Sequence, residues 1–333
     1  MARAHVVFQG EAACFADQFA GCVANKSDLD VQCLPDPLVT DADRAAFADA
    51  DVLVSYSYSA AVPRPARLRL IQVPGAGYEG IDFSAVPPGV LVCNTHGHES
   101  AIAEYVLGAL LQRLIPYAAA DSALRRNEWA LLPPGGARHG ELAGRTMALL
   151  GFGHIGRAVA ALARAFGMRV IAANRSAVTS PLIDRYFPLS ALAEFWAQGD
   201  VFCISLPGLP DTAGLVGQAA FEAMRRHAIV VNVGRGATID EAALFKALRQ
   251  QRIAGAIIDT WYQYPTPENP APAPARLPFH DLPNVLMTPH LSAWTEGTVS
   301  RRARLLAENV NRVRRGEPGL NVIWPRPAPT PLC

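Results

Sequence analysis

The sequence predicts an α/β protein made of two domains, each with a parallel β-sheet. Three observations support this fold class. The chain has 333 residues, and at about 100–200 residues per domain that length suits two domains. Short apolar runs alternate with longer segments of helical periodicity, which is typical of βα units. A glycine turn at Gly151–Gly156 also joins an apolar strand to a helix, and it marks the clearest βαβ unit in the chain.

Four strand-like apolar runs in the first hundred residues predict the sheet of the first domain. They are His5–Phe8, Asp51–Ser55, Leu70–Val73 and Val90–Cys93. Helical patterns at Glu11–Ala24 and Asp41–Ala50 lie between them. Because parallel strands need such crossovers, we expect these runs to form a parallel sheet.

A long apolar-rich helix from about Ser100 to Arg126 is predicted to cross to the second domain, and the loop Leu132–Gly140 follows it. The second domain then contains six strand-like runs. They are Arg145–Leu150, Met168–Ala173, Val201–Ser205, Ile229–Val233, Ala254–Asp259 and Val285–Thr288. A helical pattern at Arg157–Gly167 joins the first two of these strands.

The last helical pattern, at about Glu296–Arg315, is expected to return the chain to the first domain. The predicted organisation is therefore a discontinuous domain of residues 1–98 and 292–333, with a second domain of residues 99–291 inserted in it. The Pro-rich end Pro325–Cys333 predicts a loosely structured tail.

Composition and charge argue against several classes of partner. The net charge is +1, from 30 basic and 29 acidic residues, so no charge excess favours nucleic acid or an anionic membrane. No apolar run reaches the ~18 residues of a membrane span, and the first residues turn polar too soon for a signal peptide. The six cysteines include no C-x-x-C pair, which indicates reduced thiols. We therefore expect a cytoplasmic protein.

The stretch Gly151–Gly156 reads GFGHIG and matches the G-x-G-x-x-G pattern of Rossmann domains. Alone the pattern is weak, but here it follows an apolar strand and opens a helix. In that setting the glycines allow a tight turn, close approach of a pyrophosphate, and close helix–strand packing. The pyrophosphate would meet the unpaired N–H groups of the helix N-terminus. The predicted cofactor contacts in this turn are Gly151, Gly153, His154, Ile155 and Gly156.

The end of the next strand is expected to select the form of the nicotinamide cofactor. An NAD site usually places an acidic residue about 20 residues past the glycines, where it bonds the ribose 2′-hydroxyl. This sequence has Asn174, Arg175 and Ser176 there. A guanidinium can pair with a 2′-phosphate, and the two neighbours can donate hydrogen bonds. We predict a preference for NADP(H), with NAD(H) possible if Arg175 merely stacks on the adenine.

Several separated motifs together resemble the D-isomer-specific 2-hydroxyacid dehydrogenase family over roughly residues 50 to 315. They are PGAGY with Ile81-Asp82, EL with Gly144, GFGHIG, Ser205-Leu206-Pro207, NVGRG at 232–236, Asp240-Glu241, Gly255 with Asp259, and Thr288-Pro289-His290. The resemblance implies a Rossmann-like nucleotide domain inserted into a flavodoxin-like substrate domain, with a cleft between them. It also implies a homodimer built around the crossover helix, and a small 2-oxo or 2-hydroxy acid as substrate.

The resemblance also implies roles for single residues. Arg235 would hold the substrate carboxylate and carbonyl oxygen, and His290 would be the general acid/base. These roles fit the chemistry, because hydride transfer to a carbonyl leaves alkoxide character on oxygen. A guanidinium can stabilise that charge, and a protonated imidazole can supply the proton. The resemblance further implies that the backbone N–H groups of Ala76 and Gly77 bind the substrate carboxylate. The hydroxyl-rich segment with Tyr56 and Ser57 would face the substrate. The implied contacts with the cofactor are Pro207, Thr212, Val233 and Asp259.

The sequence departs from the family pattern at one important position. The family usually has a glutamate five residues after the position of Asp259, where it bonds the catalytic histidine, whereas this chain has Tyr264. Without that carboxylate His290 should hold its proton less well, although Tyr264 could still orient the ring. Glu99 could replace the missing carboxylate, or simply lie in the first turn of the crossover helix. Glu268, in a Pro-rich loop, reads more simply as a solvated charge. The sequence predicts no metal site.

Three hypotheses for the function remain open from the sequence. The first is an NADPH-preferring 2-oxoacid reductase of the glyoxylate or hydroxypyruvate type. The second is a dehydrogenase of another small anion, such as formate or a phosphorus oxyacid, which Tyr264 would suit. The third is a nucleotide-sensing binding protein on the same scaffold, which would need neither Arg235 nor His290.

Overall fold

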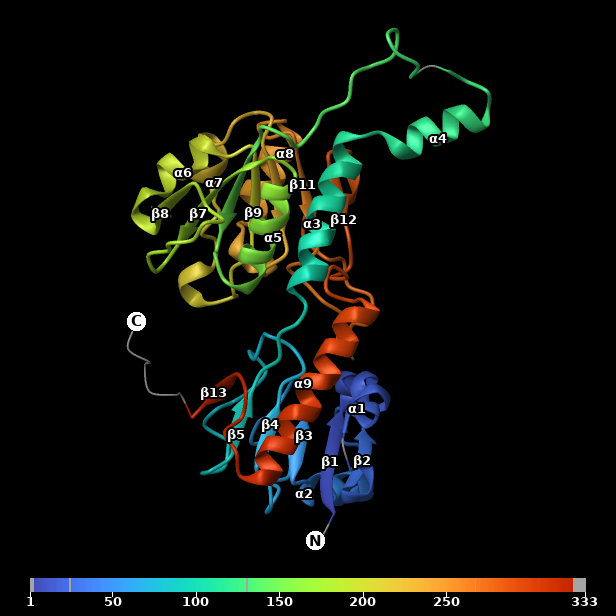
Figure 1. The fold of residues 1–333 in the computed structure, drawn as a ribbon, viewed down its shortest axis with the longest axis vertical. Helices are drawn as coiled ribbons and strands as arrows, with labels where there is room; N and C mark the ends of the chain where they lie inside the picture. The colour runs from blue at the N-terminus through green and yellow to red at the C-terminus, as the bar shows by residue number, and fades with distance from the viewer. Residues whose placement is uncertain (1–2, 24, 130, 267, 326–333) are drawn as a thin grey trace. The chain divides into compact units, whose positions relative to one another are not determined.

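The computed structural model describes residues 3–23, 25–129, 131–266 and 268–325. The chain divides into two compact units, Met1–Gly97 with Thr295–Cys333, and His98–Trp294. Figure 1 shows that the last helix, α9 (Glu296–Arg315), belongs to the same unit as the amino-terminal strands. The chain therefore leaves the first unit once and returns to it.

The first unit is an α/β unit whose sheet, in the described residues, has the order β13-β5-β4-β3-β1-β2. Its strands are β1 (Ala4–Gln9), β2 (Leu29–Leu34), β3 (Val52–Val54), β4 (Leu70–Gln72), β5 (Leu91–Cys93) and β13 (Val322–Trp324). Its helical segments are η1 (Gly10–Phe15), α1 (Ala16–Cys22), η2 (Lys26–Asp28), α2 (Asp41–Ala48) and α9. All strands pair in parallel except β13, which is antiparallel to β5. The order β2-β1-β3-β4-β5 is that of flavodoxin-like sheets.

The second unit is also α/β, with the strand order β12-β11-β10-β9-β6-β7-β8 in the described residues. Its strands are β6 (Thr146–Leu150), β7 (Arg169–Asn174), β8 (Arg185–Pro188), β9 (Val201–Ile204), β10 (Ile229–Asn232), β11 (Gly255–Ile258) and β12 (Val285–Met287). Its helical segments are α3 (Glu99–Leu114), α4 (Tyr117–Arg125), α5 (His154–Ala165), η3 (Leu189–Ala191), α6 (Leu192–Gln198), η4 (Pro210–Thr212), α7 (Gln218–Ala223), η5 (Gly236–Thr238), α8 (Glu241–Arg249) and η6 (Phe279–Asp281). The order reverses between β6 and β9, as in a Rossmann sheet. The predicted α/β class with two parallel-sheet units is confirmed.

Both faces of the second sheet are covered, and this explains its uninterrupted apolar strands. In β6, Ala148 and Leu150 pack into one apolar cluster, while Met147 and Leu149 pack into another on the opposite face. Helices α3 and α5 contribute to the second cluster, and α6, α7 and α8 contribute to the first. A strand that is buried on both faces needs no polar alternation.

The predicted single crossover helix from Ser100 to Arg126 is wrong. The structure has two helices, because α3 ends at Leu114 and α4 begins at Tyr117. Pro116 lies between them, and a proline lacks the N–H that a continuous helix needs and clashes with the preceding turn. None of the helices in the described ranges combines the length and the apolar character that a bilayer crossing requires.

Some other elements also differ from the sequence pattern. The predicted helix Glu11–Ala24 is a 3-10 segment, η1, followed by the shorter α1. Strands β2, β8 and β13 were not predicted. They are edge or next-to-edge strands with many exposed or half-buried residues, so their sequences carry little of the apolar signal that marks a central strand.

Candidate functional site

Arg235 lies in the loop that follows β10, and two neighbouring side chains hold its backbone by hydrogen bonds. The Asn232 side chain donates to the Arg235 carbonyl oxygen over 3.1 Å, and the Thr238 hydroxyl donates to the same oxygen over 2.7 Å. Gly236 lies so close to Trp261 that a Cβ atom there would be 2.2 Å from the Trp261 carbonyl oxygen. These contacts fix the loop in addition to the half-buried Arg235 side chain, which donates to the Gly234 carbonyl over 3.0 Å.

His290 follows β12 on a loop that the buried Asp259 carboxylate holds in place. Asp259 exposes none of its surface. One of its oxygens accepts from the Thr288 hydroxyl over 2.6 Å and from the Leu291 N–H over 2.9 Å, and the other accepts from the Ser292 N–H over 3.1 Å. His290 itself has a φ of 58°, a left-handed conformation that costs about 1 kcal/mol or more outside glycine. The Asp259 bonds on either side of His290 offset that cost.

This geometry gives Asp259 a structural role, because its carboxylate shapes the loop that carries His290. The contact of Asp259 with the cofactor stays a prediction. Tyr105 on α3 adds a further contact, since its hydroxyl lies 2.6 Å from the Thr288 hydroxyl. Burial raises the pKa of Tyr105 to about 12. Sequence reasoning missed Tyr105, because it lies 183 residues from its partner and no spacing pattern connects the two.

Replacing Asp259 with alanine is expected to destabilise the protein by about 3 kcal/mol, because three donors would lose their buried acceptor. The urea midpoint measured by circular dichroism checks this. Glu308→Ala removes a half-buried surface ion pair with Arg312 and should change the midpoint much less than Asp259→Ala does. An Asp259→Ala midpoint equal to that of the wild type would show that the carboxylate does not hold the loop.

Tyr264 lies against His290, at the position where the family pattern has a glutamate. Its hydroxyl oxygen accepts the Trp261 N–H over 3.0 Å and lies 3.0 Å from His290 Nδ1. The Trp261 indole N–H donates to the Thr288 carbonyl over 2.8 Å, which ties this turn to the histidine loop. Burial raises the pKa of Tyr264, while the Trp261 N–H and the positive charge of Arg235 act in the opposite direction. The structure thus brings Arg235, Tyr264 and His290 into one neighbourhood.

The glycine turn after β6 has the shape that a dinucleotide needs. Gly151 has a φ of 98°, and a Cβ atom on Gly156 would lie 2.3 Å from the Gly151 carbonyl oxygen. A Cβ atom on Gly153 would meet no atom within 4 Å. No side chain caps the N-terminus of α5, so its N–H groups can bind an anion. Of the other predicted contacts here, His154 and Ile155 open α5, and Ile155 packs partly into the core.

The residues expected to select the cofactor lie at the end of β7. The Asn174 side chain accepts the Phe152 N–H over 3.4 Å and donates to the Ser176 carbonyl over 3.1 Å. Asn174 is thus largely engaged in shaping the turn. Arg175 is exposed and has no hydrogen bond or ion pair with any residue in the described ranges. Its guanidinium is the group at this edge that can bind a 2′-phosphate.

The loop after β9 forms another wall of the same region. The Thr212 hydroxyl donates to the Pro207 carbonyl over 2.6 Å and accepts the Leu209 N–H over 2.9 Å. Thr212 therefore shapes its own loop. Ser205 donates to the Gly151 carbonyl over 3.2 Å, which links this loop to the glycine turn. Val233 is buried at the end of β10.

In the first unit, the loop after β4 presents two unpaired backbone donors. The Asn94 side chain donates to the Ala76 carbonyl over 2.8 Å, and the Thr95 N–H donates to the Gly75 carbonyl over 2.9 Å. Within the part of the chain that the structure describes, the N–H groups of Ala76 and Gly77 have no acceptor. Two adjacent unpaired N–H groups suit a carboxylate.

Tyr56 and Ser57 follow β3, as expected, but Ser57 is engaged within the protein. Its hydroxyl donates to Asp36 over 3.0 Å, and its N–H donates to the Ser55 hydroxyl over 3.1 Å. Burial raises the pKa of Tyr56, which keeps the phenol protonated and able to donate. Glu99 is the first residue of α3, where a carboxylate is favoured by the helix dipole.

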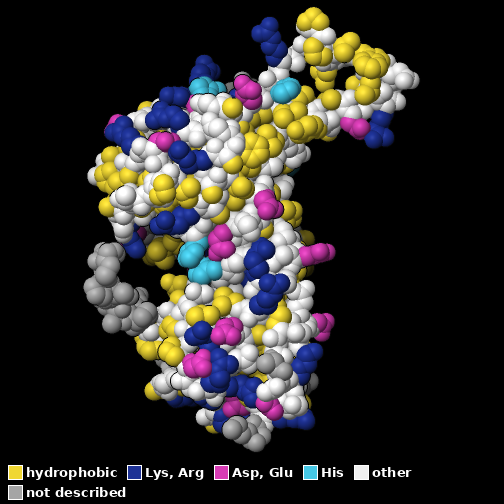
Figure 2. Space-filling view, in the orientation of Figure 1, with side chains coloured by type: hydrophobic (Ala, Val, Ile, Leu, Met, Phe, Trp, Pro, Cys, Tyr) yellow, Lys and Arg dark blue, Asp and Glu magenta, His cyan; other side chains and the backbone are white. Residues whose placement is uncertain are grey.

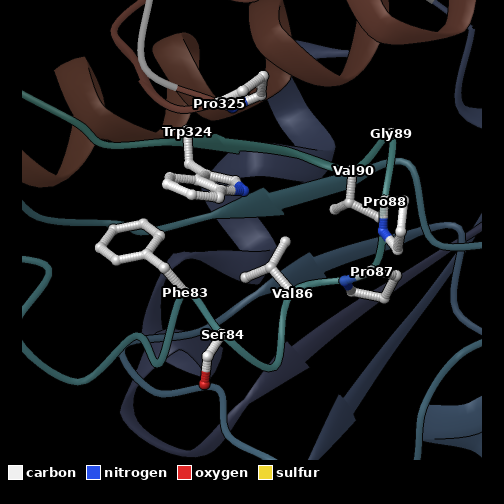
Figure 3. Close-up of a pocket in the computed structure, with 9 residues that line it drawn as sticks. All are labelled: Phe83, Ser84, Val86, Pro87, Pro88, Gly89, Val90, Trp324 and Pro325. Atoms are coloured by element: carbon white, nitrogen blue, oxygen red, sulfur yellow. The ribbon is translucent and has the colours of Figure 1, made fainter.

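The first unit also contains an apolar pocket of about 600 Å³ (Figure 3). Phe83 and Trp324 form part of its wall, with ring centroids 5.3 Å apart. Its nine lining residues include no charged side chain and none of the predicted site residues. It does not suit a small carboxylate substrate.

The chain is similar to dehydrogenases of known sequence and structure. Residues 107–292 match the model described as "D-isomer specific 2-hydroxyacid dehydrogenase, NAD binding domain". The chain is 32% identical over 263 residues to a glyoxylate reductase of Korarchaeum cryptofilum, covering 77% of this chain and 76% of that protein. It is also 32% identical over 294 residues to a D-3-phosphoglycerate dehydrogenase of Methanocaldococcus jannaschii. That match covers 83% of this chain but about half, 52%, of the relative.

Solved structures resemble the whole chain. An NADPH-dependent glyoxylate/hydroxypyruvate reductase from Sinorhizobium meliloti, in complex with NADP and malonate, has a TM-score of 0.76 and 25% identity. The match covers 98% of each chain. A 2-hydroxyacid dehydrogenase family protein from Aeromonas salmonicida has a TM-score of 0.77 at 25% identity, and covers 97% of this chain and 99% of that one.

Proposed function

Since the chain belongs to the D-isomer specific 2-hydroxyacid dehydrogenase family, we propose that it is an NAD(P)H-dependent reductase of a small 2-oxo acid. The observation that carries the proposal is the neighbourhood of Arg235, Tyr264 and His290. These residues follow three adjacent parallel strands, β10, β11 and β12, of the sheet that carries the glycine turn. Ligands of open α/β sheets bind at the carboxyl ends of the strands, where these residues lie.

In the proposed hydride transfer, each group of the site has a separate role. A bound nicotinamide supplies the hydride, and the glycine turn with the N-terminus of α5 fits its pyrophosphate. Arg235 holds the substrate carboxylate and stabilises the negative charge that develops on the carbonyl oxygen. His290 gives its proton to that oxygen, and takes it back in the reverse reaction. In the first unit, taken by itself, the N–H groups of Ala76 and Gly77 suit a carboxylate.

We assign NADP(H) as the preferred cofactor, because Arg175 is exposed and no acidic residue follows β7 at this position. The five cysteines in the described ranges are free, which supports a cytoplasmic location.

The test is turnover with a panel of glyoxylate, hydroxypyruvate, pyruvate, phenylpyruvate and 2-oxoglutarate, with loss of reduced-nicotinamide absorbance as the signal. Faster oxidation of NADPH than NADH with one of these acids is the expected result. Reduction of NADP+ or NAD+ by formate or phosphite, seen as a gain of that absorbance, without turnover of any 2-oxo acid would favour the second candidate, which rests on Tyr264. Nucleotide binding without any turnover would favour a sensor.

We propose that the protein is a homodimer, and that α4 with the loop to Leu132 contributes to the interface. None of the α4 side chains is buried. Tyr117, Leu124, Trp129 and Leu132 are each more than half exposed, and Figure 2 shows hydrophobic atoms gathered over this segment, beyond the end of α3. An apolar surface of this kind is typical of an interface.

The variant Leu124→Asp with Trp129→Asp is expected to raise the dimer dissociation constant about 30-fold or more, because interface anchors contribute about 2 kcal/mol or more. Sedimentation equilibrium measures the change. Leu189→Asp, at an exposed apolar residue elsewhere in the unit, is the control. A double variant with the same dimer dissociation constant as the wild-type protein would exclude this interface.

A further inference from the structure

The first unit contains a second cavity, of about 590 Å³, whose lining is rich in charged side chains. The lining includes five arginines and two aspartates, which is an excess of three positive charges. The arginines are Arg3, Arg67, Arg69, Arg314 and Arg315. The whole chain carries a net charge of only +1, so this excess is a local feature of the cavity.

Three separate segments of the first unit bring these arginines together. Arg3 precedes β1, Arg69 precedes β4, and Arg314 lies in the last turn of α9. Figure 1 shows the N-terminus and the last turn of α9 at the same end of this unit. Because β1 and β4 belong to one parallel sheet, the cavity lies at the amino ends of the strands. The loop with the two unpaired N–H groups follows the carboxyl end of β4, so the cavity is a separate site.

The two carboxylates of the cavity already have partners within the unit. One Asp51 oxygen accepts the His5 N–H over 2.8 Å, and the other lies 3.3 Å from Arg67 Nε. Asp28 pairs with Arg314, whose Nη2 lies 3.2 Å from the carboxylate. Since both acidic groups are neutralised by arginines, the cavity does not suit a cation.

Two of the guanidinium groups have no carboxylate partner among the described residues. Arg315 is already paired, because its Nε and Nη2 bond the two Glu317 oxygens over 2.6 and 2.8 Å. Arg69 donates to the Val313 carbonyl with one nitrogen, and its other two nitrogens make no hydrogen bond in the described ranges. Arg3 is exposed and has neither a hydrogen bond nor an ion pair with any described residue. Two positive charges of the cavity are therefore unbalanced.

Stabilisation of the end of α9 explains only some of these arginines. Basic side chains near a helix C-terminus interact with its last carbonyl groups and its dipole, and this accounts for Arg69, Arg314 and Arg315. It does not account for Arg3, which has no bond to α9. The same helix end disfavours an anion, so a ligand must carry enough charge to gain more from the two guanidinium groups than it loses there.

We propose that this cavity binds the phosphate monoester of a small polar molecule, with Arg3 and Arg69 holding the phosphate. The dianion balances the two guanidinium groups, and each of them can donate to it with a pair of N–H groups. A phosphate also has three terminal oxygens, so it can accept from the strand side and the helix side together. The Asn25 and Asn311 amides line the same cavity and can bond hydroxyl groups of the ligand. The volume lies within the usual range of ligand sites, about 300–1,000 Å³.

The test is a phosphorus-31 NMR titration of glycerol 2-phosphate with the full chain at about pH 8, where the probe carries two negative charges. Arg3→Gln is expected to raise the dissociation constant about 10-fold, since it removes a charge-assisted hydrogen bond. The fold should not change, because no bond among the described residues is lost. The urea midpoint checks this. Succinate, a dianion with two carboxylates, should displace the probe only at a higher concentration.

Two control variants separate this cavity from other sources of phosphate binding. Arg44→Gln removes an exposed arginine of α2 in the same unit, which does not line the cavity and has no side-chain bond in the described ranges. Arg175→Gln removes the cation at the end of β7 in the second unit. Both should bind the probe as the wild-type protein does.

The opposite results would each overturn the proposal. An equal loss of affinity in Arg3→Gln and Arg44→Gln would indicate a general charge effect. Loss in Arg175→Gln alone would place the phosphate in the second unit. Absence of binding by the wild-type protein would show that the cavity takes no phosphate monoester, and succinate that binds as tightly as the probe would show that it does not select a phosphate. The titration needs no turnover, so it does not depend on the proposed function.

Discussion

Arg235→Ala is expected to lower kcat/KM for a 2-oxo acid about 1,000-fold. In the proposed function the Arg235 guanidinium holds the carboxylate and the developing oxyanion, and loss of one such donor costs about 100–1,000-fold or more. The loop should survive the change, because Asn232 and Thr238 hold the Arg235 backbone. Stopped-flow measurement of single turnovers checks the effect on the chemical step.

The matched variant is Arg235→Lys, which keeps the charge but loses the planar pair of donors. Its activity should lie between those of the wild type and Arg235→Ala. Nucleotide binding, followed by quenching of intrinsic fluorescence, should be the same in all three proteins. Normal turnover of Arg235→Ala would remove Arg235 from the substrate site.

Arg175→Asp is expected to reverse the cofactor preference, with the ratio of kcat/KM for NADPH to that for NADH falling about 100-fold. The change removes the cation proposed to pair with a 2′-phosphate and adds a carboxylate that would repel it. Both effects disfavour NADPH, and at about 1.4 kcal/mol each they add up to that factor. The new carboxylate can instead accept a hydrogen bond from the ribose 2′-hydroxyl of NADH.

Arg185→Asp is the control for a general charge effect, since Arg185 pairs with Glu194 on β8 and α6 of the same unit. It should leave the cofactor ratio unchanged. An Arg175→Asp protein with the wild-type ratio would show that Arg175 does not recognise the 2′-phosphate.

The exposed face of α4 and three of the edge strands could not be predicted from the sequence. The exposed apolar residues of α4 could be seen in the sequence only as part of a longer helix. Pro116 breaks that helix, so the face of α4 could not be assigned from a continuous periodicity. Strands β2, β8 and β13 were hidden for a related reason, because exposed or edge strands lack a strong apolar pattern.

The sequence by itself determined the α/β class, the glycine turn and the family. These depend on short-range information: apolar runs that a two-sided sheet requires, and glycines spaced for a tight turn and a close helix. Arg235 and His290 could be named because the motifs NVGRG at 232–236 and Thr288-Pro289-His290 resemble those of the family.

Only the tertiary structure decided what surrounds those two residues. Tyr264 meets His290 from 26 residues away, and the turn that aims its hydroxyl depends on the Trp261 N–H. The Asp259 carboxylate holds the loop that carries His290, because it is buried and accepts hydrogen bonds from three donors of that loop. Contacts between distant segments decide which donors are paired and where a side chain points. A local sequence pattern carries no information on these contacts.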